Sequence, residues 1–359
     1  MKTLVRWLKR LLVLVVVLAL VLTGLVYWLT YHPQDVQAAP VRCAKNAPVL
    51  KAGQPVRVMS WNVQYLAGDG YVFYYDLPDG DGPDERPSKA SIAKTLDDVV
   101  RVIREEDPDV VQLQEIDRGS DRTDNADQLA LVQQKLGASL YPCTASAYYH
   151  KVKFLPLPQI WGKVGMSLGV LSKTKIESAT RYQLPHICGD PATVAFNFDR
   201  AVLGVKLPTS SGKALTTMVT HLDAFAQSCD TMQRQVEGVE KILEKTPSPW
   251  LISGDFNLLA TDKARAALQP VQRTYFAPHT ELTPLLDAYE SFPNEAQVDS
   301  GSPVYFTHFP NDPAVGHADR TIDYFFYSPG LARKSEAIRQ ITGPRISDHF
   351  PMFVTVQAP

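Results

Sequence analysis

The sequence predicts a layered α/β domain, with two sheets flanked by helices, that follows one N-terminal transmembrane helix. Residues 11–29 form an uncharged run long enough to cross a bilayer. After residue 55, short apolar strands alternate with helical patterns in both halves of the chain, and polar residues follow several strand ends. We therefore divide the chain into an anchor (1–30), a linker (31–54) and one catalytic domain (55–359).

The start of the chain has the length and charge of a membrane anchor. Its uncharged run of 19 residues spans roughly 28 Å at about 1.5 Å per residue, close to the hydrocarbon thickness of a bilayer. A cleaved signal peptide is the alternative, although its apolar segment is normally shorter and the small-residue site at 36–38 lies well beyond this run. Four basic residues precede the run: Lys2, Arg6, Lys9 and Arg10. The positive-inside rule therefore predicts a cytoplasmic N-terminus and an extracytoplasmic domain, which is periplasmic if the cell is bacterial.

Beyond the anchor, the periodicity of apolar residues predicts the elements of the domain. Residues 31–54 contain prolines and alanines without periodicity, which is typical of a linker. Residues 56–60 alternate like a strand, and residues 89–105 place apolar side chains on one helical face. We expect, in chain order, strands at 56–60 and 109–113 with helices at 89–105 and 126–136, then strands at 167–172, 200–207 and 215–220, a helix at 231–244, and strands at 250–253, 321–327 and 352–356.

Two insertions interrupt this pattern. Residues 67–86 are acidic and aromatic, and residues 148–161 are apolar but broken by Pro156 and Pro158, so no regular element is expected there. An Asp-Gly-Asp-Gly piece in the first insertion resembles a calcium loop but lacks the full ligand pattern, and a solvated turn is the alternative. Both insertions fit either contact with a lipid interface or packing under neighbouring loops.

Charge and cysteine content narrow the partners and the compartment. Five basic residues and one acidic residue lie within 1–44, so the remainder carries a net charge of −6 within an overall charge of −2. A mildly acidic domain is a poor match for long nucleic acid, and no feature indicates an obligate protein partner. The four cysteines, Cys43, Cys143, Cys188 and Cys229, lack zinc-site spacing. In an exported domain they can form disulfides in three possible pairings, and free buried thiols are the alternative.

Polar residues capable of chemistry follow the ends of several predicted strands. In a layered α/β protein, active sites collect at such strand ends. Each segment alone could also be a turn or contain a structural residue, so the evidence for an active site lies in the whole set of segments. The six segments, in chain order, are Ser60-Trp61-Asn62, Gln114-Glu115, Thr220-His221-Leu222-Asp223, Gly254-Asp255-Phe256-Asn257, Ile322-Asp323-Tyr324 and Ser347-Asp348-His349.

In this order, the segments resemble those of the endonuclease/exonuclease/phosphatase superfamily, whose fold is like that of deoxyribonuclease I. The resemblance covers roughly residues 55–357, and no member of the motif set is missing. It implies a deoxyribonuclease I-like two-sheet sandwich with metal-dependent phosphoesterase activity. Glu115 and Asn62 would form the core of a magnesium site, with Asp348 nearby, and manganese also suits such oxygen ligands.

The resemblance also implies roles for the other residues. In that superfamily the histidine of the last motif pairs with the aspartate of the preceding one, which implies a pair between His349 and Asp323 here. Such a pair fixes the tautomer of the imidazole. Asp255 and Asn257 would orient the attacking water and bind a phosphoryl oxygen. His221 would donate to a non-bridging oxygen as charge builds up in the transition state. The base that activates the water is either His349 or Asp255.

Three substrate classes fit this chemistry. A lipid phosphodiester is favoured by the anchor, by the acidic domain and by the two insertions. An exported nuclease acting on DNA or RNA is the first alternative, and a phosphomonoesterase or a catalytically silent domain is the second. Arg200 is a candidate for binding phosphate, although a structural charge at this position fits equally well. We therefore expect a membrane-anchored, Mg²⁺- or Mn²⁺-dependent phosphodiesterase that acts on a membrane lipid or its headgroup.

Overall fold

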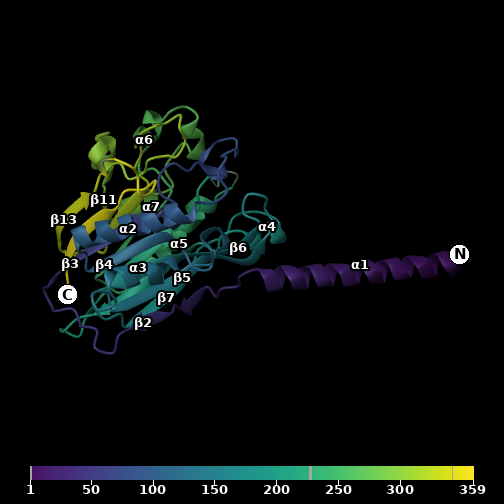
Figure 1. Ribbon diagram of the computed structural model, residues 1–359, viewed down its shortest axis with the longest axis horizontal. Coiled ribbons are helices and arrows are strands. Elements are labelled where there is room, and N and C mark those ends of the chain that lie inside the picture. The colour runs from purple at the N-terminus through teal and green to yellow at the C-terminus, as the bar shows by residue number, and fades with distance from the viewer. Residues whose placement is uncertain (1, 226–228, 342) are drawn as a thin grey trace.

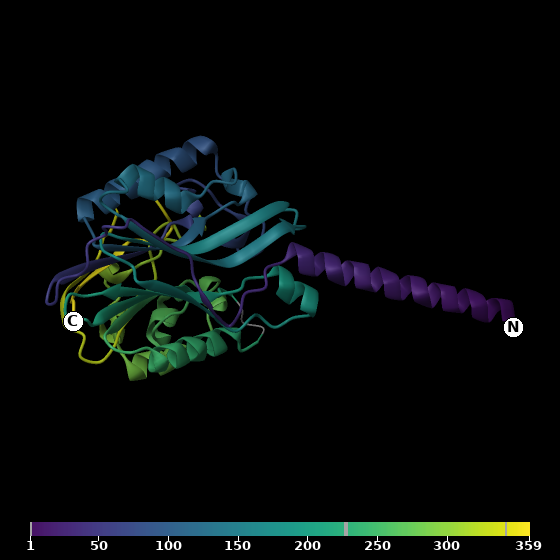
Figure 2. The ribbon, with the colours of Figure 1, turned by 90° about the horizontal axis from the view of Figure 1, so that it is seen from below.

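The domain consists of two face-to-face sheets covered by helices on both outer faces (Figures 1 and 2). The computed structural model describes residues 2–225, 229–341 and 343–359. Apolar side chains from both sheets fill the space between them, and two further clusters fill the space between each sheet and its helices. The predicted two-sheet α/β sandwich is therefore confirmed.

Sheet I contains the first strands of the predicted domain and its last one. Its order is β13-β14-β3-β4-β6-β5-β2. β3 and β4 are parallel, and the other neighbouring strands are antiparallel. The strands are β2 (Val41–Cys43), β3 (Pro55–Asn62), β4 (Val110–Asp117), β5 (Cys143–Leu155), β6 (Gly162–Ser172), β13 (Arg333–Ile338) and β14 (Met352–Gln357).

Sheet II is built mainly from the second half of the chain. Its order is β1-β7-β8-β9-β10-β12-β11, with β9 and β10 as its parallel pair. The strands are β1 (Val36–Ala38), β7 (Ser178–Gln183), β8 (Ala201–Pro208), β9 (Ala214–His221), β10 (Trp250–Asp255), β11 (Glu290–Phe292) and β12 (Asp323–Tyr327).

Helices pack on the two outer faces, and one helix leaves the domain. α2 and α3 cover sheet I, and α5 and α7 cover sheet II (Figure 2). α2 begins after Ser88, whose side chain accepts a hydrogen bond from Ser91 N and so satisfies a free donor of the first turn. The helices are α1 (Lys2–Leu29), α2 (Lys89–Glu106), α3 (Gln128–Leu136), α4 (Pro191–Phe196), α5 (Thr231–Lys245), α6 (Asp262–Ala267), α7 (Thr283–Ala288) and α8 (Glu295–Asp299).

α1 projects from the domain and exposes its apolar side chains along its length (Figure 1). Its composition and its 28 residues are sufficient to cross a membrane. A signal sequence near an N-terminus has the same properties. α1 is therefore a possible membrane anchor.

The segment that we predicted as a linker, residues 31–54, is part of the domain instead. β1 pairs with β7 and β2 pairs with β5, so this segment adds an edge strand to each sheet. Leu50 is fully buried in the core between the sheets. The prediction was wrong because three-residue edge strands have too little periodicity to be recognised and are held by backbone hydrogen bonds.

The two insertions differ from each other in the structure. In residues 67–86, Phe73 is buried, and Tyr71 and Tyr75 pack against the core between the sheets, so this insertion is not an apolar surface. Residues 148–161 are regular up to Leu155, because β5 continues through them, contrary to the prediction. Within these two insertions, large apolar side chains are exposed at the tip of the hairpin between β5 and β6, as at Trp161.

Disulfides join all four cysteines. Cys43 pairs with Cys143 and ties β2 to the start of β5. Cys188 pairs with Cys229 and ties the segment before α4 to the segment before α5. The structure therefore has one of the three possible pairings of the four cysteines, and none of the four is free.

Candidate active site

The ends of two parallel strand pairs bring the predicted residues together at one edge of the sandwich. Asn62, His221 and Asp255 are the last residues of β3, β9 and β10. Asp323 is the first residue of β12 and lies opposite Asp255 in the antiparallel register. Asn62 Nδ2 donates to Asp255 Oδ2 at 3.1 Å, which joins the edge of sheet I to that of sheet II. The site therefore forms where both sheets end, as expected for strand-end chemistry.

Two residues of the site have strained backbones. Glu115 has φ +54° and lies in an irregularity of β4, where the register with β6 shifts between Leu113 and Ile116. Asn257 has φ +53°. A left-handed conformation of this kind costs on the order of 1–3 kcal/mol for a residue other than glycine, and it is often found at functional sites. The bulge interrupts the alternation of β4 at the residue that carries the proposed metal carboxylate.

Asp255 is the centre of the cluster and is almost completely buried. His221 Nε2 and His349 Nε2 each lie 3.4 Å from its Oδ2 atom. Its Oδ1 atom accepts a hydrogen bond from the backbone N–H of Asn257 at 2.9 Å. Burial raises the pKa of Asp255 to about 7, against the opposing effect of the nearby imidazole of His349. The carboxyl group can therefore exchange a proton near neutral pH.

His349 is held between two carboxylates. Its Nδ1 atom lies 2.8 Å from Asp323 Oδ2, opposite the contact between its Nε2 atom and Asp255. Burial alone would lower the pKa of His349, but the carboxylates of Asp323 and Asp255 raise it well above its usual value. Trp61 Nε1, in β3, donates to the carbonyl oxygen of His349 at 2.8 Å and so fixes the loop before β14 against β3. The two carboxylates therefore fix the imidazole of His349 and favour its cationic form.

His221 has the opposite electrostatic character. Its Nδ1 atom lies 3.2 Å from the hydroxyl of Tyr149 and 3.9 Å from Glu115 Oε1. Burial lowers the pKa of His221 well below its usual value, and the guanidinium of Arg200 lowers it further. The same site thus favours the neutral form of His221 and the cationic form of His349.

Arg200 flanks this cluster and does not reach its centre. Its Nε atom donates to Asp223 Oδ1 at 2.8 Å, and its guanidinium lies over the ring of Phe198 at 4.0 Å. Its side chain is 5% exposed, and its Nη1 atom has no hydrogen-bond partner among the described residues. Lys173, directly after β6, pairs with Asp107 and forms no contact with the site.

Three carboxyl groups lie beside this cluster, and the charge of Asp348 acts on those of Glu115 and Asp76. Burial raises the pKa of each of them, and repulsion from Asp348 raises the pKa of Glu115 and of Asp76 further, that of Asp76 to about 7. Asn311 Nδ2 lies 3.3 Å from Asp76 Oδ2 and 3.4 Å from Asp348 Oδ2. The nearby cation of Arg122 is already engaged by Asp117.

These half-buried carboxyl groups offer the kind of ligand that a divalent cation takes. Oxygen ligands with excess negative charge are what Mg²⁺ and Mn²⁺ prefer. Asn62 Nδ2 donates to Glu115 Oε1 at 3.1 Å, whereas Asn62 Oδ1 accepts a hydrogen bond from the backbone of Gln64 at 3.0 Å. Asn62 would have to exchange these two contacts in order to offer its oxygen to a metal beside Glu115.

Residues that the sequence analysis did not single out also line the site. The ring of His308 lies 4.6 Å from that of His349, and burial lowers the pKa of His308 well below its usual value. Asp76 and Asn311 join the carboxylate group from distant loops. In the sequence, Asp76 is one of several acidic residues in the insertion at 67–86. No local sequence pattern distinguishes His308 or Asn311.

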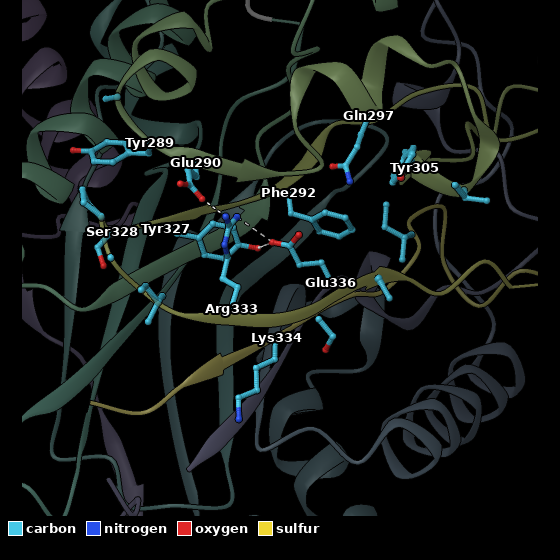
Figure 3. Close-up of a pocket in the computed structure, with 18 residues that line it drawn as sticks. Tyr289, Glu290, Phe292, Gln297, Tyr305, Tyr327, Ser328, Arg333, Lys334 and Glu336 are labelled. Atoms are coloured by element: carbon cyan, nitrogen blue, oxygen red, sulfur yellow. Dashed lines mark hydrogen bonds and ion pairs between the residues drawn. The ribbon is translucent and has the colours of Figure 1, made fainter. Parts of the chain in front are cut away.

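A separate cavity lies between β11, β12 and β13 (Figure 3). Its volume is about 1060 Å³, and Tyr327, at the end of β12 opposite Asp323, lines it. The guanidinium of Arg333, which also lines the cavity, is neutralised by ion pairs with Glu290 and Glu336 (Figure 3). We therefore place the active site at the cluster around Asp255 and not in this cavity.

Comparisons with known proteins agree with the fold. An endonuclease/exonuclease/phosphatase from Beutenbergia cavernae is 20% identical, with a TM-score of 0.57 over 85% of this chain and 72% of that one. An endonuclease/exonuclease/phosphatase family protein from Leptotrichia buccalis is 16% identical, with a TM-score of 0.54 over 84% and 99%. The human Nocturnin catalytic domain with bound sulfate is 17% identical, with a TM-score of 0.52 over 89% and 97%. No curated protein gives a significant match.

The family model described as the Endonuclease/Exonuclease/phosphatase family matches residues 59–349. That range contains every residue of the cluster around Asp255, from Asn62 to His349. It also covers most of the chain, and the structural likeness extends over the same sandwich. The chain therefore belongs to the endonuclease/exonuclease/phosphatase family.

Proposed function

We propose that this protein is a metal-dependent phosphodiesterase that hydrolyses a membrane lipid or its headgroup outside the cytoplasm. The observation that carries the proposal is the buried row of Asp323, His349 and Asp255, with contacts of 2.8 and 3.4 Å between successive members. Such a row combines a proton acceptor with a fixed cation, which hydrolysis of an anionic ester requires.

Asp255 is the better candidate for the base. A pKa of about 7 leaves much of Asp255 ionised at neutral pH. The two carboxylate partners of His349 raise its pKa and favour its protonated form, which cannot accept a further proton. In the proposed step, a water oxygen attacks phosphorus, Asp255 takes its proton, and the bond from phosphorus to the leaving oxygen breaks. That oxygen then takes up a proton from the solvent.

The remaining polar groups stabilise the charge that develops. The cationic imidazole of His349 offsets negative charge on the phosphoryl oxygens. The hydroxyl of Tyr149 and the side chain of Glu115 orient His221 from its Nδ1 side, which leaves Nε2 directed at Asp255. The Nη1 atom of Arg200 is buried and has no hydrogen-bond partner among the described residues, so it is a further donor beside the site.

Glu115, Asp348 and Asn62 would hold the metal ion, and Mg²⁺ or Mn²⁺ suits these oxygen donors. When bound, such an ion supplies Lewis acidity that polarises the phosphoryl group. Asp76 lies close enough to this group to share in the same charge balance. The raised pKa values of these carboxyl groups support the metal site, because a cation would relieve the repulsion among them.

Two features support a lipid over a nucleic acid. The chain beyond residue 44 carries a net charge of −6, which opposes binding to long polyanions. In addition, α1 would confine the domain to a membrane surface, where lipid headgroups have a high effective concentration.

The test is a substrate panel with Mg²⁺. The purified full chain is offered phospholipid vesicles, duplex DNA, single-stranded RNA, bis(p-nitrophenyl) phosphate and p-nitrophenyl phosphate, and Asp255→Asn serves as the inactive control. We expect hydrolysis of the lipid and of bis(p-nitrophenyl) phosphate. Salt-sensitive cleavage of DNA or RNA without lipid hydrolysis would establish the nuclease alternative, and cleavage of the monoester alone would establish a phosphatase.

A further inference from the structure

The C-terminal end of α1 packs against the domain and is not attached by a free tether. α1 contacts both β5 and α4, and both views show these elements beside its C-terminal end (Figures 1 and 2). Thr30, directly after the helix, is buried. The hydroxyl of Tyr31 accepts a hydrogen bond from Gln37 Nε2 at 3.1 Å, and its ring faces that of Tyr148 at 6.4 Å. The position of α1 therefore constrains the orientation of the whole domain.

A short chain of contacts leads from the end of α1 to the hairpin tip between β5 and β6. Lys153 Nζ lies 4.0 Å from the ring centre of Trp28, in the last turn of α1. Phe154 is the next residue of β5, and its ring packs edge-to-face on Trp161 at 5.1 Å. Tryptophan and tyrosine at the end of an apolar span lie at headgroup level in a membrane. The hairpin tip then lies at the same level as Trp28.

The surface of this tip has the composition of a membrane-contact site. Trp161 is 65% exposed and Leu157 is 45% exposed. Lys151 and Lys153 lie on β5 before the tip and Lys163 lies on β6 after it, and burial together with the charges of the other two lowers the pKa of Lys151. Among the described residues, none of these three ammonium groups forms an ion pair with a carboxylate, although the domain as a whole is acidic. An exposed aromatic side chain flanked by lysines that lack carboxylate partners is complementary to an anionic bilayer surface.

The same strand connects this surface to the active site. Tyr149 contacts His221 through its hydroxyl, and Phe154 lies five residues further along β5. At about 3.3 Å per residue, the strand covers roughly 17 Å between Tyr149, which contacts His221, and Phe154 at the start of the tip. The edge that carries the active site thus faces the side from which α1 leaves the domain.

We infer that the tip of the β5–β6 hairpin, residues 154–161, together with Lys151, Lys153 and Lys163, forms a membrane-contact face. This face rests on the anionic headgroups of the leaflet from which α1 emerges, and it holds the active-site edge toward the bilayer. The inference depends on α1 remaining attached and is independent of the substrate, since a tethered nuclease would have the same orientation.

Site-specific fluorescence on the full chain in lipid nanodiscs tests this inference. Trp161→Cys and Val49→Cys are each labelled with the environment-sensitive fluorophore NBD. Both positions are exposed and apolar, but Val49 lies beside Leu50, which bridges to Thr209 just after β8, at the end opposite the active site. Nanodiscs of phosphatidylcholine with phosphatidylglycerol are compared with and without doxyl-labelled lipid.

We expect blue-shifted emission and strong quenching by doxyl lipid at position 161, and water-like emission without quenching at position 49. Lys153→Glu with Lys163→Glu should reduce the quenching at position 161 at least twofold, whereas the exposed pair Lys45→Glu with Lys213→Glu should not. Water-like, unquenched emission at position 161 would overturn the inference. Quenching that is insensitive to both charge pairs, or release of α1 from the mature chain, would also overturn it.

Discussion

Replacing Asp323 by Asn tests the role of the His349 cation, because it removes one charge and hardly changes the shape. In the wild type, Asp323 Oδ2 lies 2.8 Å from His349 Nδ1, and the two side chains are only 5% and 4% exposed. The carboxylates of Asp323 and Asp255 outweigh the effect of burial and raise the pKa of His349. In the variant, the charges of Asp255 and Asp348 still oppose the effect of burial, but the largest opposing charge is gone, so the pKa of His349 falls.

The size of this fall follows from the electrostatics of the pair. Two unit charges about 4 Å apart attract each other by about 4 kcal/mol at an effective dielectric constant of 20. At 1.36 kcal/mol for each pKa unit, this corresponds to about 3 units. Since Asp255 remains 3.4 Å from Nε2, the charged imidazole keeps one partner. We therefore expect the pKa of His349 to fall by about 2–3 units.

The assay is the pH profile of kcat/KM for bis(p-nitrophenyl) phosphate. The active form requires protonated His349, so activity is lost as the pH rises through the pKa of His349. In Asp323→Asn this alkaline limb should move to lower pH by about 2–3 units, with a loss of about 10²–10⁴ in rate at neutral pH. Asp262→Asn is the matched control, because Asp262 pairs with His279 at a similar distance on the surface. An alkaline limb at the same pH in the variant and the wild type would refute the role of His349.

Three further predictions concern the base, the disulfides and the topology. Wild-type activity should rise with pH around 7, as Asp255 loses its proton, and a profile that is flat from pH 5 to 8 would exclude Asp255 as the base. Removing the Cys43–Cys143 disulfide, which closes a separation of 100 residues, should lower the free energy of unfolding in urea by about 4.7 kcal/mol, against about 3.9 kcal/mol for Cys188–Cys229 with its separation of 41 residues. The opposite order would contradict this entropic account. Alkaline phosphatase fused after Pro359 should be active and a reporter that needs the cytoplasm should be inactive, whereas the reverse pattern would contradict an exported domain.

The strands of the core were predictable because burial leaves a periodic trace in the sequence. Residues 250–253 were expected as a strand and lie within β10, which is buried along its whole length. Helix α2 was expected over 89–105 and ends at Glu106, one residue later. Both elements combine apolar periodicity with clear turn or capping residues, which determine the element locally.

The segment after α1 was not predictable in this way. β1 and β2 consist of three residues each and are held by pairing with β7 and β5, which are more than 90 residues away in the chain. Backbone pairing of this kind depends on the tertiary structure and leaves no local pattern. The attachment of the domain to α1 was therefore mistaken for a flexible tether.

The candidate site was predictable in its motifs but not in its environment. Asn62, His221 and Asp255 follow apolar strands, so their position at a strand edge could be expected. The contribution of Asp76 could not, because it comes from a loop that reaches Asp348 only through Asn311. The opposite pKa shifts of His221 and His349 also depend on partners that come from other strands.

The central claim, that this is a metal-dependent phosphodiesterase, is tested most directly by a metal titration. The purified full chain is treated with EDTA, and hydrolysis of bis(p-nitrophenyl) phosphate is measured as Mg²⁺ is returned, for wild type, Glu115→Gln and the exposed control Glu105→Gln. We predict no activity after chelation, full recovery in the wild type and the control, and at least a tenfold higher Mg²⁺ requirement in Glu115→Gln, equivalent to about 1.4 kcal/mol. Undiminished hydrolysis after exhaustive chelation, or the same Mg²⁺ requirement in all three proteins, would contradict the account.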